Sequence, residues 1–67
     1  MNNLIDNLII EFKKLKKVRG SLFENFMTFS DLYMREMKDD KYKEEKMIVL
    51  NYILENRESI SLKLLKN

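Results

Sequence analysis

Glycine occurs only once in these 67 residues, at Gly20, and proline does not occur at all. These two residues interrupt regular backbone structure most strongly, so the chain has few points at which an element must stop. Apolar side chains recur at spacings of three and four residues on both sides of Gly20, which is the periodicity of an amphipathic helix. The sequence therefore predicts an all-α protein: a small antiparallel bundle of three or four helices, in a single helical domain over residues 1–67.

The first helix boundary is predicted at Gly20. Glycine accepts the left-handed conformation that closes a helix, and Ser21 with Glu24 forms the Ser-x-x-Glu pattern of a capping box. We expect the first helix to end near Val18 and the second to run from Ser21 to about Lys38, with a kink near Thr28 or Ser30 as the alternative. The apolar face expected for the first helix consists of Leu4, Ile5, Leu8, Ile9, Phe12, Leu15 and Val18.

A third helix is predicted to begin at Asp39 and Asp40, because aspartate caps helix N-termini. Its expected apolar face, with the continuation of that face, consists of Met47, Leu50, Ile53, Leu54, Ile60, Leu64 and Leu65. Residues 47–54 and 60–64 would also suit buried strands, but no hairpin turn supplies a partner strand, so helix is preferred. Asn56 could end this helix. Residues 57–67 then form a short helix of their own, for which Ser59 is a possible cap, or they continue the third helix.

The chain contains neither cysteine nor histidine. This excludes disulfides, zinc sites with thiolate or imidazole ligands, and nucleophiles activated by imidazole. The paired carboxylates of residues 39–40 and 44–45 are better explained as helix caps and solvated surface than as an acid–base or metal cluster. One glycine is too few for a phosphate-binding loop. We therefore expect a protein that is not an enzyme and that uses no cofactor and no metal.

Composition also bears on location and origin. No run of about 18 apolar residues is present, and the N-terminal residues lack the basic segment and cleavage site of a secretory signal. A cysteine-free chain fits a reducing compartment, so a cytoplasmic location without membrane contact is expected. Abundant lysine, asparagine and isoleucine without alanine indicate AT-rich coding. That is typical of a low-GC bacterium, or of a phage or mobile element with small helical modulators of other proteins.

Four apolar residues are predicted to point away from the core, and they are the candidate partner-binding residues: Ile10, Leu32, Ile48 and Tyr52. Ile48 and Tyr52 lie one turn apart, on the side of the third helix opposite to its expected apolar face. A helix that is apolar on both sides must be covered on both, either by the C-terminal segment or by another protein. Because so short a chain forms only a small core, we expect a homodimer that serves as an adaptor or inhibitor of another protein.

A basic cluster supports an alternative function. It consists of Lys13, Lys14, Lys16, Lys17 and Arg19, and it gives residues 1–20 a net charge of +3, against −3 for residues 21–40. Such a cluster can contact nucleic-acid phosphates, although cations also gather at helix C-termini because the helix dipole favours them. The alternative is therefore a small DNA-binding transcriptional regulator that uses this cluster or the third-helix lysines, Lys41, Lys43 and Lys46.

Overall fold

Four helices account for most of the computed structural model, which describes residues 2–15, 20–36 and 40–66, with the side chains of residues 2 and 40–44 outside the description. The helices are α1 (Asn2–Lys13), α2 (Leu22–Glu36), α3 (Asp40–Glu55) and α4 (Arg57–Leu65). The predicted all-α bundle is confirmed, and the described residues form four helices. The third helix begins at Asp40 as predicted, while Asp39 lies outside the described residues.

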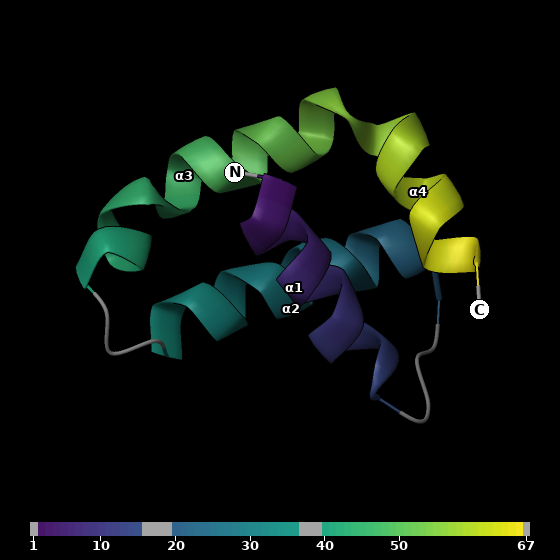
Figure 1. Ribbon diagram of the computed structural model, residues 1–67, viewed down its shortest axis with the longest axis horizontal. Coiled ribbons are helices and arrows are strands. Elements are labelled where there is room, and N and C mark those ends of the chain that lie inside the picture. Colours follow the sequence, from purple (N-terminus) through teal and green to yellow (C-terminus); the bar gives the residue numbers. More distant parts are fainter. Residues whose placement is uncertain (1, 16–19, 37–39, 67) are drawn as a thin grey trace.

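The helices pack around one another in an unequal way. α2 and α3 lie side by side and run in opposite directions, and they form the most extensive helix pair (Figure 1). α1 crosses α2, and α4 folds back from the end of α3 toward the beginning of α2. As a result α2 contacts all three other helices and forms the centre of the fold.

α1 ends earlier than the sequence predicted. The amides of Lys14 and Leu15 donate to the carbonyl oxygens of Glu11 and Phe12, three residues earlier, at 3.2 and 3.1 Å. Bonds of this spacing tighten the last turn and close the helix. Leu15 consequently lies outside the helix and is exposed, so its predicted place in the core is wrong. The predicted end at Val18 lies outside the described residues.

Gly20 takes the predicted left-handed conformation before α2, but it does not close the first helix, because α1 ends at Lys13. Gly20 has a φ of 86°, in the left-handed region that favours glycine. α2 is opened by Asn25, whose amide nitrogen and side-chain Nδ2 both donate to the Ser21 carbonyl oxygen, at 3.0 and 2.9 Å. Among the described residues, no hydrogen bond joins the Ser21 side chain to the Glu24 backbone amide or the Glu24 side chain to the Ser21 backbone amide, so the reciprocal capping box does not form.

α2 is one uninterrupted helix from Leu22 to Glu36, so the preferred single helix is confirmed. Thr28 does not start a new helix, and its Oγ1 donates to the Glu24 carbonyl oxygen at 3.2 Å within the same one. The Ser30 side chain is fully buried in the core instead of capping a terminus.

All four helices contribute to one hydrophobic core. Phe12 of α1 packs edge-on against Phe26 of α2, with ring centroids 5.5 Å apart and an interplanar angle of 73°. This is a favoured geometry for aromatic pairs. The buried apolar residues are Ile5, Leu8, Ile9, Phe12, Phe23, Phe26, Met34, Val49, Ile53, Ile60 and Leu64.

The face that α3 presents to the core is only partly the one predicted: Ile53 and Leu50 pack in or against the core as predicted, but Val49 replaces Met47 and Leu54. Val49 and Ile53 are fully buried, whereas Met47 and Leu54, both predicted to be buried, are 62% and 51% exposed. Apolar residues occur around most of this helix, so periodicity alone allowed two orientations. α2 selects between them because it approaches α3 on the side of Lys46, which pairs with a carboxylate of α2.

A short final helix settles the open question about residues 57–67. Asn56 interrupts the helical path, and its Nδ2 donates to the Tyr52 carbonyl oxygen at 2.8 Å. α4 then buries Ile60 and Leu64 against the other helices. Leu65, predicted to continue the apolar stripe, is exposed. The break lies at Asn56, so the predicted cap at Ser59 is wrong.

Candidate interaction surfaces

The side of α3 that faces away from the core is rich in apolar side chains. Met47, Ile48 and Leu54 are 62%, 59% and 51% exposed. They surround the exposed Asn51, which lies one turn after Met47 and one turn before Leu54. We call these four residues the α3 outer face. Since Val49 and Ile53 are fully buried on the other side, α3 is apolar both toward and away from the core.

Tyr52 does not belong to this outer face. It was predicted to point away from the core with Ile48, but it is half-buried and packs against the core cluster. The reason is angular: Tyr52 lies one turn after the buried Val49 and next to the buried Ile53, so it falls at the edge of the inward-facing arc. This corrected placement makes a polar substitution at Tyr52 a test of folding as much as of binding.

Ile10 and Leu32 are exposed as predicted, at 55% and 48%, but in different surroundings. The residues one turn from Leu32 on α2 include Thr28, Arg35 and Glu36, all exposed and polar. A single exposed leucine among polar side chains is ordinary for a protein surface. Ile10, in contrast, borders a hollow between two helices.

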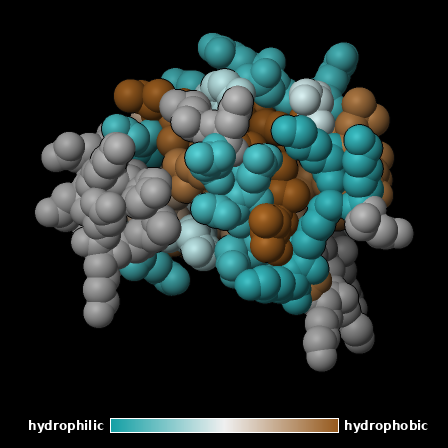
Figure 2. Space-filling model, in the orientation of Figure 1, coloured by the Kyte–Doolittle hydropathy of each residue, from teal (hydrophilic) through white to brown (hydrophobic). Residues whose placement is uncertain are grey.

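That hollow lies between α1 and α4, has a volume of about 370 Å³, and is lined by Asp6, Ile9, Ile10, Lys13, Lys63 and Lys66. We call it the α1–α4 hollow. Its apolar residues come from α1, and its lysines come from the C-terminal ends of both helices. Figure 2 shows the same combination on this face of the molecule: apolar surface over α1, bordered by hydrophilic side chains.

The lysines of the hollow differ in how much of their charge is compensated. Lys63 Nζ lies 3.8 Å from Asp6 Oδ1, an exposed ion pair. Lys13 Nζ donates to the backbone carbonyl oxygen of Lys66, which orients the ammonium group but does not neutralise it. No carboxylate of the described residues is recorded beside the ammonium of Lys66. Among the described residues, Lys63 is therefore the one lysine of the hollow with a carboxylate beside it.

The structure describes only some of the residues that were predicted to bind nucleic acid. Lys14 pairs with Glu11 at 2.9 Å, which leaves Lys13 as the cluster lysine that faces the hollow. The other three cluster residues (Lys16, Lys17 and Arg19) lie outside the described residues, as do the side chains of Lys41 and Lys43. The structure adds Lys63 and Lys66 to the basic surface. The sequence missed these two because they are about 50 residues from the cluster.

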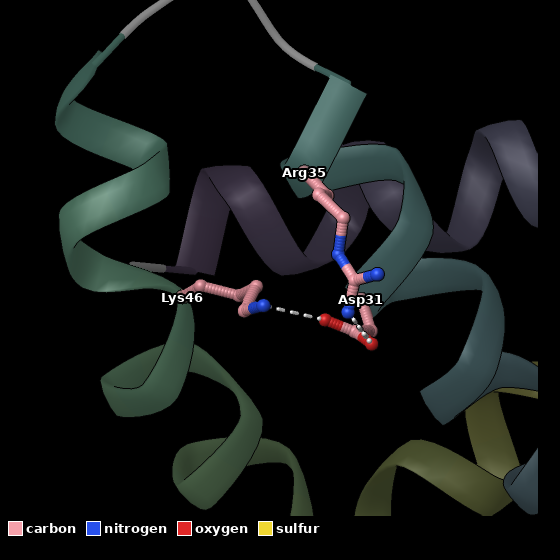
Figure 3. Close-up of polar contacts among 3 residues, drawn as sticks. All are labelled: Asp31, Arg35 and Lys46. Carbon is pink, nitrogen blue, oxygen red and sulfur yellow. Dashed lines mark hydrogen bonds and ion pairs between the residues drawn. The ribbon is translucent and has the colours of Figure 1, made fainter.

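A second charged group links α2 to α3. Asp31 of α2 accepts contacts from Arg35 Nη2 at 3.1 Å and from Lys46 Nζ of α3 at 3.0 Å (Figure 3). The hydrogen bond from Lys46 lowers the pKa of Asp31 below its ordinary value of 3.8; partial burial opposes this shift, and the charge of Arg35 adds to it. Asp31 is therefore ionised at neutral pH and acts as a structural bridge. It also occupies Lys46, one of the predicted phosphate-binding lysines.

These features define a class: a four-helix all-α bundle whose candidate sites are exposed apolar and basic surfaces. In the part of the chain that the structure describes, no helix has the length and apolarity needed to cross a bilayer. Comparisons with protein-family models, curated proteins and solved structures gave no match to this chain. Its function must therefore be argued from its surfaces.

Proposed function

We propose that this is a small, non-catalytic adaptor or inhibitor that acts by binding another protein through the α3 outer face. The observation that carries the proposal is that α3 is apolar on both sides, with Val49 and Ile53 buried while Met47, Ile48 and Leu54 stay exposed. A surface helix of a bundle that has no partner is normally polar on the side away from the core. The excess of apolar side chains on this outward side supports a partner that covers them.

Burial of these exposed side chains by a partner would supply enough free energy for a specific complex. Full burial of one large aliphatic side chain contributes about 1.5–3 kcal/mol. Three such side chains on one helix can therefore serve as the central anchors that carry most of the binding energy of an interface. The polar Asn51 between them has an amide that both donates and accepts hydrogen bonds, which would help to fix the register of the partner.

The same features support pairing with a second copy of the chain. In a symmetric dimer, the same patch of both subunits meets across a two-fold axis. The Asn51 amide can pair with its own counterpart there, because it holds donors and acceptors together. We propose homodimerisation through the α3 outer face as the resting state, with the protein partner competing for the same surface.

Substitutions on the α3 outer face test this proposal. Ile48→Ser combined with Met47→Ser should weaken partner capture and self-association by at least about tenfold, because two apolar anchors are removed. Leu32→Ser is the matched control, since it removes an exposed leucine from a polar region of α2 and should leave both unchanged. The measurements are affinity capture with mass spectrometry and sedimentation equilibrium, with helicity checked by circular dichroism. Equal behaviour of the double variant and the control would refute the proposal.

Binding to DNA as a transcriptional regulator is the second candidate, favoured by the meeting of Lys13 with Lys63 and Lys66 at one end of the bundle. If it is correct, changing these three lysines to glutamine should eliminate retention on a DNA column. The salt dependence of binding should then fall by roughly one unit of slope for each phosphate that a lysine no longer neutralises. Under the protein-binding proposal, the same variant should mainly alter association rate and salt sensitivity.

A further inference from the structure

The residues that line the α1–α4 hollow carry an excess of positive charge. Its lining holds three lysines and one aspartate, which together carry a net charge of +2. These four side chains meet at one small surface, although they come from opposite ends of the chain. A localised excess of one sign attracts ligands of the other sign.

The floor of the hollow favours a protein ligand over a nucleic acid. Ile9 is buried beneath the surface and Ile10 projects from it, with 55% of its side chain exposed. A phosphate backbone offers nothing apolar to cover an isoleucine. An amphipathic peptide offers both an apolar side chain for the floor and carboxylates for the surrounding lysines.

The size and polarity of the hollow further limit the kinds of ligand that can bind there. A volume of about 370 Å³ is at the low end of the range of small-molecule sites, and it suits one or two inserted side chains. Lys13 Nζ donates to the Lys66 carbonyl oxygen, which places this ammonium group between the ends of α1 and α4 at the hollow. Lys63 is within reach of Asp6, and a ligand carboxylate would compete with that exposed pair.

We infer that the α1–α4 hollow is a docking site for an acidic amphipathic segment of a partner protein. A large apolar side chain of this segment contacts Ile10. The glutamates or aspartates that flank it pair with Lys13, Lys63 and Lys66. This inference rests on the proposed function, because it names the chemistry of the protein partner. It adds a second contact surface, on helices other than α3. Charge would guide the partner to this surface, and the apolar contact would retain it.

A labelled synthetic peptide tests the inference directly. The probe is a short peptide with two leucines flanked by glutamates, titrated with the full chain by fluorescence anisotropy at low and physiological salt. Its matched control is the same peptide with lysine in place of every glutamate, and a labelled oligothymidine of equal charge represents nucleic acid. We expect the acidic peptide to bind at least about tenfold more tightly than the lysine peptide, and its affinity to fall as salt increases.

Variants assign the binding to the hollow. Ile10→Ser should lower the affinity for the acidic peptide by about tenfold. Lys13→Gln combined with Lys66→Gln should lower this affinity and also reduce its dependence on salt. Lys14→Gln is the matched control for charge, because Lys14 is already paired with Glu11 outside the hollow. Leu32→Ser is the control for an exposed apolar residue. Both controls should stay within about twofold of the original protein.

Three results would overturn the inference. They are equal binding of the acidic and lysine peptides, no binding of the acidic peptide up to millimolar concentration, and an Ile10→Ser variant that binds it unchanged. Tighter binding of oligothymidine, abolished by the lysine variants and insensitive to Ile10→Ser, would identify a phosphate site instead. If the α3 outer face still captures a protein partner while the acidic peptide does not bind, only this inference is wrong. If capture fails while the peptide binds, the proposed role of α3 is wrong.

Discussion

The backbone of Gly20 turns the chain between α1 and α2, and its side-chain position is open. A Cβ added there would meet its nearest neighbour, Asn25 Nδ2, at an ordinary 3.8 Å. Any cost of substitution must therefore come from the φ of 86° and not from crowding. At this glycine, the effect of backbone conformation can therefore be measured separately from the effect of steric crowding.

We predict that Gly20→Val destabilises the protein by roughly 1–2 kcal/mol, because a β-branched residue resists the left-handed conformation. Gly20→Asn is the matched control and should cost clearly less, since asparagine tolerates this region. Urea unfolding followed by circular dichroism measures both. Equal losses of stability for the two variants would show that the backbone at this corner differs from the one described.

At the buried Ser30, in contrast to Gly20, we expect that a substitution does not lower stability. Its side chain is fully buried, and its Oγ has no recorded hydrogen-bond partner. An unsatisfied buried hydroxyl has lost its water without compensation. Ser30→Ala should therefore be neutral or should raise the free energy of unfolding by up to about 1 kcal/mol. A decrease of more than about 1 kcal/mol in the same urea titration would indicate that the hydroxyl does make a bond, for instance to the preceding turn.

Between helices, the Asp31 bridge connects α2 to α3 and should make their contact sensitive to acid. Because the pKa of Asp31 is lowered in the folded protein, its contribution is fully present above the ordinary value of 3.8. The contribution is lost as the pH falls below 3.8 and through the lower folded pKa. It should amount to about 1 kcal/mol or less, since the partners are partly exposed.

We predict that Asp31→Asn lowers stability at pH 7 and flattens the decline of stability as the pH falls below 3.8. Lys46→Gln should reproduce much of this effect, because the Lys46 hydrogen bond is the main cause of the shift. Lys14→Gln removes a more exposed ion pair within α1 and serves as the control. An unchanged acid profile in Asp31→Asn would show that the bridge does not contribute to folding.

For the molecule as a whole, small size links stability to association. A chain of 67 residues forms a limited core, so covering the α3 outer face by a second copy should add measurably to stability. We predict that the melting temperature rises with protein concentration, by roughly a few degrees for each tenfold increase above the dissociation constant. Ile48→Ser should remove this dependence while leaving helicity intact. A melting temperature independent of concentration in the original protein would exclude the proposed dimer.

Local sequence signals were sufficient for the helical class and for several boundaries. The left-handed Gly20, the uninterrupted α2 and the start of α3 at Asp40 depend on residues within about one turn of each other, so they can be read from neighbouring positions. The absence of cysteine and histidine likewise excludes whole classes of chemistry without reference to any fold. The exposure of Ile10 and Leu32 also followed from helical periodicity, because the inward face of each of their helices is unambiguous.

Other features depended on contacts between distant residues. α3 has apolar residues on nearly every side, so only its packing against α2 decided that Val49 and Ile53 are buried and that Met47 and Leu54 are exposed. The α1–α4 hollow could not be foreseen either, because Lys13 and Lys66 meet only when α4 folds back over the bundle. Periodicity reports which side of a helix is apolar. Where two sides are apolar, or where two chain segments combine into one surface, the position of the neighbouring helices decides the outcome.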